Sequence, residues 1–203
     1  MNALIKLFNV IILLLCFASN LAFGWKITKE LKKELKQKLK AVEENKNSPY
    51  AHFDLAITYA YTNYVQEGWD ELKEVHKLDP DFALEALRIY GKAALENPDD
   101  WRLRYRLAFA FYFNDYKKRA IEELKEVLRI DPKNVFAYGY IGLIYGEMDK
   151  VDEGIKWIKK GLKIVNNVAA LHLLLASAYY KKGESWKGFW EGVEALRLKA
   201  LGY

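Results

Sequence analysis

The side chains that most often carry catalysis or bind metals are scattered in this sequence. Its three histidines, His52, His76 and His172, lie far apart along the chain, and its one cysteine, Cys16, lies in an apolar stretch near the N-terminus. No phosphate-binding loop, paired metal-ligand motif or nucleophile beside a base is present. We therefore expect no catalytic residue, no metal site, no cofactor and no enzymatic activity, and we interpret His52 and His172 as packing residues.

Aromatic and arginine side chains are the unusual feature of the composition. Trp, Tyr and Phe make up 15% of the 203 residues, and the segment RLRYRLAFAFYF, residues 102–113, holds five aromatic rings and three arginines. Such groups serve recognition, because contiguous exposed rings form binding surfaces and Tyr and Arg contribute strongly at protein interfaces. Apolar residues alternate in this segment as they do in a half-buried strand, so the element that carries them must be identified first.

A 34-residue period identifies that element as a helix. Pro98 and Pro132 are 34 residues apart, and residues 49–82, 101–134, 135–168 and 169–203 align in one phase. Each copy has a large aliphatic residue at its position 7, a small residue at 8, an aromatic residue at 11 and a small residue at 20. These residues are Leu55, Ala56, Tyr59 and Gly68; Leu107, Ala108, Phe111 and Ala120; Ile141, Gly142, Tyr145 and Gly154; and Leu175, Ala176, Tyr179 and Gly188.

This pattern resembles the tetratricopeptide repeat family, in which each repeat is a pair of antiparallel helices. The resemblance implies an all-α, right-handed α-solenoid whose neighbouring repeats bury a continuous core between them. Residues 102–113 then lie in the first helix of a repeat. The last copy departs from the pattern, with Ala200 in place of the closing proline and Gly192 in place of an aliphatic residue. Turns are expected between the paired helices, at Asn63, Asp115, Asp149 and Gly183.

Two segments fall outside the period. Residues 25–48 are predicted to form one basic amphipathic helix, and residues 83–100 fit only the second half of a repeat. We therefore expect a helix, one repeat, a lone helix and three further repeats. A lone helix between paired helices alters which side chains face the groove, so we expect the array to change direction near Asn97–Asp100.

The resemblance also implies which side chains face the concave groove, where this family binds its ligands. They are found at positions 2, 5, 6, 9, 12 and 13 of a repeat. We predict a partner-binding groove lined by Tyr50, Phe53, Ile57, Tyr61, Arg102, Tyr105, Arg106, Phe109, Tyr112, Phe113, Phe136, Tyr140 and Leu143. The alternative is that these rings pack between adjacent first helices. Phe53 and Ile57 replace the Lys and Asn of the family's carboxylate clamp, so a clamp for chaperone tails is not expected.

A second surface is predicted at the end of the last copy. Helical spacing places Trp186, Phe189, Trp190, Val193 and Leu196 on or beside a face that no capping helix follows. We expect this end surface to bind a partner or a second copy of the chain.

The first 24 residues read as a secretory signal peptide. Lys6 precedes a short apolar run, residues 10–18, and Ala22 and Gly24 have the spacing of a cleavage site. Cleavage after Gly24 gives a periplasmic or secreted protein without Cys16. Lipidation of Cys16 is not expected, because Leu15 precedes it where lipoprotein sites have Gly or Ala. The alternative is an inner-membrane anchor at residues 7–23, because seven lysines lie in residues 26–40 and resist translocation. Residues 26–40 could also contact a membrane peripherally.

The net charge of +5 is spread along the chain and does not indicate nucleic-acid binding. Together these features, with the resemblance, predict an exported bacterial scaffold of the cell envelope that binds an apolar or aromatic peptide or helix of another protein. The alternatives are a structural subunit that self-associates through its end surface, and an accessory subunit of an envelope enzyme.

Overall fold

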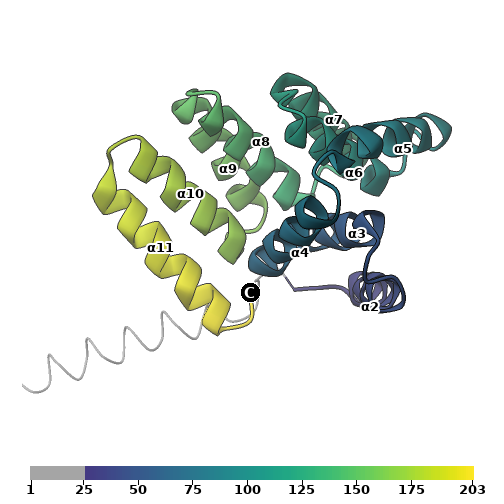
Figure 1. The fold of residues 1–203 in the computed structure, drawn as a ribbon. Helices are drawn as coiled ribbons and strands as arrows, with labels where there is room; N and C mark the ends of the chain where they lie inside the picture. Colours follow the sequence, from purple (N-terminus) through teal and green to yellow (C-terminus); the bar gives the residue numbers. More distant parts are fainter. Residues whose placement is uncertain (1–25) are drawn as a thin grey trace, which may run out of the picture.

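The computed structural model describes residues 26–203, which hold ten helices and no strand (Figure 1). The predicted all-α solenoid of repeats is therefore confirmed, and the alternating segment is helix α6. The predicted signal peptide lies outside the described residues. The helices are α2 (Lys29–Glu44), α3 (Pro49–Ala60), α4 (Val65–Leu78), α5 (Phe82–Glu96), α6 (Trp101–Phe113), α7 (Lys117–Ile130), α8 (Val135–Glu147), α9 (Val151–Ile164), α10 (Ala169–Lys181) and α11 (Ser185–Ala200).

Eight of the helices form four hairpins: α3/α4, α6/α7, α8/α9 and α10/α11. Three of their turns hold a residue with positive φ, namely Asp115 and Asp149 at 60° and Gly183 at 83°. Glycine adopts this conformation freely, and the short polar side chain of aspartate tolerates it. Helix α6 begins sharply because the Asp100 carboxylate accepts hydrogen bonds from the N–H groups of Arg102 and Leu103.

Small residues at positions 8 and 20 let the two helices of a hairpin touch. In α8/α9, a Cβ added to Gly154 would lie 2.5 Å from the carbonyl oxygen of Gly142, and one added to Gly142 would lie 2.7 Å from the carbonyl oxygen of Gly154. In α6/α7 the same positions are Ala108 and Ala120, both buried. The contact between backbones fixes the crossing point of each hairpin.

The residue at position 4 ties each hairpin together by side-chain contacts. In the first repeat it is His52, whose Nδ1 lies 2.6 Å from a carboxylate oxygen of Glu71 at position 23. In the last repeat it is His172, whose Nδ1 lies 2.6 Å from a carboxylate oxygen of Glu191 at the same position. In the second repeat Arg104 pairs with Glu123 at 3.0 Å. The four residues at position 4 also bond to the backbone carbonyl six residues earlier. They are His52, Arg104, Tyr138 and His172. The structure thus gives both histidines a structural role.

The lone helix α5 interrupts the regular stacking of hairpins. It packs along α6, and α3 lies against both α5 and α6. The Phe53 ring of α3 contacts Phe82 and Tyr90 of α5 at 5.6 Å and Phe113 of α6 at 6.3 Å. In Figure 1, α8 to α11 run side by side, whereas α3 and α4 run across them. The first hairpin is therefore turned so that α4 faces the concave side of the last two repeats.

The first and last repeats also touch directly. The backbone N–H of Ala170, at the start of α10, donates a hydrogen bond to Asn63 Oδ1 in the α3/α4 turn, at 3.2 Å. The Lys26 ammonium lies 5.5 Å from the centre of the Tyr203 ring at the opposite end of the chain. The array is therefore closed on itself. Within residues 26–203, none of the helices has the length and apolar character needed to cross a bilayer.

Candidate functional site

Most of the predicted groove side chains in the first two repeats are buried. Phe53, Ile57, Tyr61, Tyr105, Arg106 and Phe109, together with Phe136 of the third repeat, are each at most 8% exposed. The prediction that they line an open groove is wrong. The physical reason is the turn imposed by α5, which brings the concave faces of α3 and α6 against each other, with the Tyr61 and Tyr105 rings 5.4 Å apart. The alternative interpretation, packing between first helices, holds for these residues.

The two arginines predicted for the groove belong to an ion-pair network between α2, α3 and α6. Arg106 pairs with Asp54 and lies 3.6 Å from Glu34, while Arg102 pairs with Glu34 at 2.8 Å. Lys38 of α2 also pairs with Asp54. Burial alone would raise the pKa of Asp54, but the neighbouring charges of Arg106 and Lys38 hold it below its ordinary value. This network fastens the N-terminal helix to the array.

Besides Arg102, five predicted groove residues keep part of their surface. Tyr50 is exposed but stacks on Tyr90, 6.0 Å away, and takes no part in the cavities described below. The Tyr112 hydroxyl donates to Glu147 at 2.7 Å. The four that lie together beneath helix α4 are Tyr112, Phe113, Tyr140 and Leu143.

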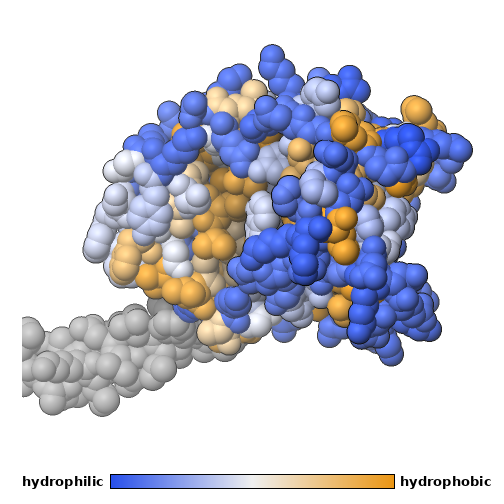
Figure 2. Space-filling view, in the orientation of Figure 1, coloured by the Kyte–Doolittle hydropathy of each residue, from blue (hydrophilic) through white to orange (hydrophobic). Residues whose placement is uncertain are grey.

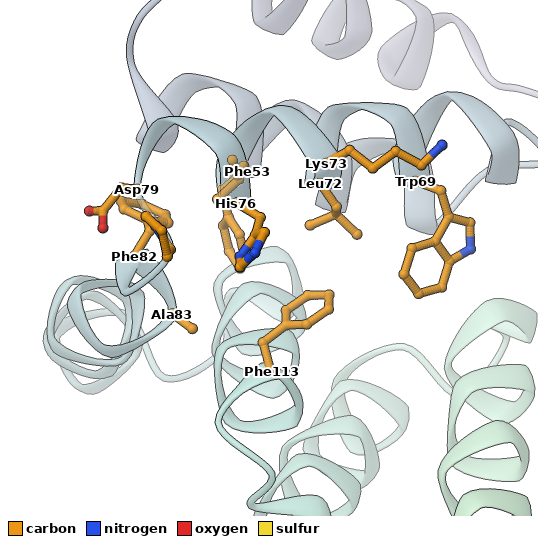
Figure 3. A pocket seen from close by; sticks show the side chains of 11 residues that line it. Phe53, Trp69, Leu72, Lys73, His76, Asp79, Phe82, Ala83 and Phe113 are labelled. Atoms are coloured by element: carbon orange, nitrogen blue, oxygen red, sulfur yellow. The ribbon is translucent and has the colours of Figure 1, made fainter.

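Helix α4 bounds an open cleft whose other wall is the concave face of α6, α8 and α10. Trp69 projects from α4 into this space and contributes to the lining of four cavities. We call the space the Trp69 cleft. Figure 3 shows one of its chambers, where Leu72, His76 and Trp69 extend from α4 toward Phe113 of α6.

The Trp69 cleft has two chambers of different character. The first, of about 380 Å³, lies between α4, α5 and α6 and has Lys73, His76 and Asp79 in its lining. The second, of about 520 Å³, is lined by apolar and uncharged residues of the described chain. They are Val65, Trp69, Phe136, Tyr140, Leu143, Ala170, Leu171, Leu173, Leu174, Ala176, Ser177, Tyr180 and Gly192. The second chamber can accommodate an apolar group but offers no partner for a charge.

The second chamber is open to solvent. Leu173 is 53% exposed and Tyr180 is 51% exposed, both on α10. The hollow between α10 and α4 shows a strongly hydrophobic surface in Figure 2. Gly192 of α11, which departs from the repeat pattern, has no atom within 4 Å of the place its Cβ would take. The missing side chain therefore widens this chamber.

The sequence prediction omitted three residues of this chamber, namely Trp69, Leu173 and Tyr180. Leu173 and Tyr180 occupy positions 5 and 12 of the last repeat, so the repeat alignment could have found them. Trp69 lies on a second helix, where the pattern places no groove residue. Its role depends on the turn of the whole α3/α4 hairpin, and no local signal in the sequence reveals it.

The predicted end surface is exposed on α11. Trp186 and Leu196 are 70% and 71% exposed, and Phe189, Trp190 and Val193 also face solvent. The three aromatic rings contact one another at centre distances of 5.4 to 5.9 Å. These side chains lie together on a bare face of α11, and what binds there stays a prediction.

Comparisons with known proteins agree with this fold. No family model matches the chain. The TPR repeat-containing protein MJ1428 of Methanocaldococcus jannaschii is 27% identical over 156 residues, which are 64% of this chain and 27% of that protein. The chain thus spans about a quarter of that relative's length.

Two solved structures are similar to the chain to different degrees. The thermophilic TPR protein TTC0263 of Thermus thermophilus superimposes with a TM-score of 0.57 at 18% identity, over 83% of this chain and 82% of that one. A crystal structure of MamA gives a TM-score of 0.47 at 19% identity, over 84% of this chain and 89% of that one.

The fold and its open cleft define an α-solenoid of the kind that serves as a protein–protein interaction scaffold. The relative and the Thermus thermophilus neighbour are both tetratricopeptide repeat proteins, so the chain is similar to that family in sequence and in fold.

Proposed function

We propose that this protein binds an apolar, uncharged segment of another protein in the second chamber of the Trp69 cleft. The observation that carries the proposal is the open chamber between α4, α8 and α10, in which no described lining residue is charged. Exposed apolar surface of this kind is costly to leave in water and is typical of binding sites. The partially exposed Leu173 and Tyr180 supply the contact area at its mouth.

The bound segment is an amphipathic helix in this proposal. Helix α4 already presents Val65, Trp69 and Leu72 to the concave face, at spacings of four and three residues. That spacing is one stripe of an α-helix. The concave face therefore accepts a helical stripe from the chain itself, and a second helix beside α4 would continue the same packing toward α10.

A capture experiment tests the site. The protein carrying Leu173→Asp should lose partners that the wild type retains from a native extract, because the new charge lies in a chamber without a counter-charge. Leu95→Asp is the matched control, since Leu95 is 80% exposed on α5 and lies outside the cleft. Partners retained equally by all three proteins would show that the cleft is not the binding site.

We further propose that residues 1–24 direct export and are removed after Gly24, which places the scaffold in the periplasm or outside the cell. The short apolar run and the Ala22–Gly24 spacing support this. A role in assembling envelope machinery is suggested by analogy with the family alone. Intact-mass measurement of the natively expressed protein decides the first point: a chain that begins at Trp25 supports cleavage, and one that retains residues 1–24 supports the anchor at residues 7–23.

A further inference from the structure

Helix α11 has two apolar faces, and only one of them is packed. Gly188, Ala195 and Leu198 are buried against the rest of the array. On the opposite side the described residues leave bare an apolar stripe, which we call the α11 outer face. It consists of Trp186, Phe189, Trp190, Val193, Leu196 and Leu201.

A basic segment begins where this face ends. Tyr203 packs with Ala169 and Leu198 beyond the end of α11, and the Lys26 ammonium lies over the Tyr203 ring. From there the chain runs back to α2, as Figure 1 shows. Four lysines exposed on α2 follow within ten residues: Lys29, Lys32, Lys33 and Lys36.

We propose that the α11 outer face and these lysines together form a docking surface for an anionic lipid membrane. Tryptophan and phenylalanine favour the boundary between lipid headgroups and acyl chains. Lysines near that boundary are attracted to anionic headgroups. A lipid surface can contact both the apolar α11 outer face and the lysines that follow beyond its end, whereas a second copy of the chain would match only the apolar part.

The chain before Lys26 agrees with this orientation. Its apolar run ends at Ala18, eight residues before Lys26, and an extended chain spans at most about 28 Å over that length. If residues 1–24 are retained in a membrane, the end of α11 must lie close to it. If they are removed, the new α-amino group adds a positive charge to the chain just before Lys26.

Vesicle flotation tests the proposal with the chain that begins at Trp25, which keeps every contact of the described fold. It should float with vesicles of phosphatidylcholine and phosphatidylglycerol, less with phosphatidylcholine alone, and less at high salt. Phe189→Glu should weaken binding by about tenfold or more, because a carboxylate would enter the interface. Lys32→Glu with Lys33→Glu should weaken binding to the anionic vesicles to a similar extent, about tenfold. Leu95→Glu, an exposed position on α5, is the matched control and should bind like the wild type.

Two further measurements separate lipid from a protein occupant. Brominated lipids should quench Trp fluorescence, and the quenching should fall in a variant with Trp186→Phe and Trp190→Phe that still floats. Light scattering should find the wild type monomeric in the absence of lipid. The proposal is overturned if the protein does not float, if Phe189→Glu floats like the wild type, or if the wild type is a dimer that Phe189→Glu dissociates.

Discussion

At the scale of single residues, burial reverses the order of importance among the α6 rings. Position 11 is part of the core in the repeat pattern, and position 9 belongs to the groove. In the structure Phe109, at position 9, is 8% exposed and contacts the Tyr105, Tyr140 and Phe113 rings. Phe111, at position 11, is only partly buried beside Tyr116.

Truncation of these two rings should therefore have unequal effects. Phe109→Ala removes a ring from the centre of the aromatic cluster, and we expect it to lower the free energy of unfolding by about 3–5 kcal/mol. Phe111→Ala should lower it by less, because part of that ring already contacts water. Denaturant titration of both variants measures the difference. A larger loss for Phe111→Ala would show that the repeat pattern, and not the turn of α3, decides the core.

The buried carboxylate of Asp54 should make stability depend on acid. Its pKa is lowered in the folded state, so its ionised form stabilises the fold above about pH 3.9, the ordinary value, and this contribution disappears as the pH falls through the lower, folded-state pKa. At neutral pH Asp54→Asn should cost about 3–5 kcal/mol, since the buried Arg106 would lose its nearest carboxylate and keep only the more distant Glu34. The variant should also lose part of this acid dependence.

Urea titrations at a series of pH values measure both effects. Asp70→Asn is the control, because Asp70 pairs with Lys73 on an exposed face and such pairs contribute little. An acid profile that is the same for wild type and Asp54→Asn would contradict the assigned role.

At the scale of helices, two glycines of the α8/α9 hairpin should respond differently to substitution by alanine, because only one of them lies where the helices touch. Gly154→Ala would place a methyl group 2.5 Å from the Gly142 carbonyl oxygen, which forces α8 and α9 apart. We expect a loss of about 1–3 kcal/mol. Gly146→Ala meets nothing within 4 Å and should stabilise α8 by about 0.5–1 kcal/mol through helix propensity. Thermal melts of the two variants should shift in opposite directions, and a shift in the same direction would argue against the close contact.

The sequence predicts local features well and the binding surface poorly. Hairpin positions, the small residues at their crossings and the turns at Asp115 and Asp149 depend on nearby residues, so the repeat pattern contains them. The burial of Arg106 depends on Asp54, which lies 52 residues earlier. No periodicity encodes that contact, because it exists only after α5 has turned α3 onto α6. The end surface was predictable because the spacing of apolar residues within α11 alone gives the helix a second apolar face.

At the scale of the whole molecule, closure should be visible in solution. The Asn63–Ala170 hydrogen bond brings the first repeat to the last. We expect small-angle scattering to give a profile that fits the closed arrangement and that no uniform, open superhelix reproduces. Asn63→Ala should leave the helical content unchanged and shift the profile toward a larger radius. A wild-type profile that fits a regular open array would contradict closure.

The contact between Lys26 and Tyr203 has a consequence for the order of the helices along the chain. A chain shortened to residues 26–203 would have two ends that already meet, and a short linker could join them at little cost in chain entropy. The chain could then be opened elsewhere, for example in the exposed stretch at Asp99 between α5 and α6, to give a circularly permuted protein that begins with the three regular repeats. Because α2, α3 and α6 find one another through side chains and not through chain order, the permuted protein should reach the same fold.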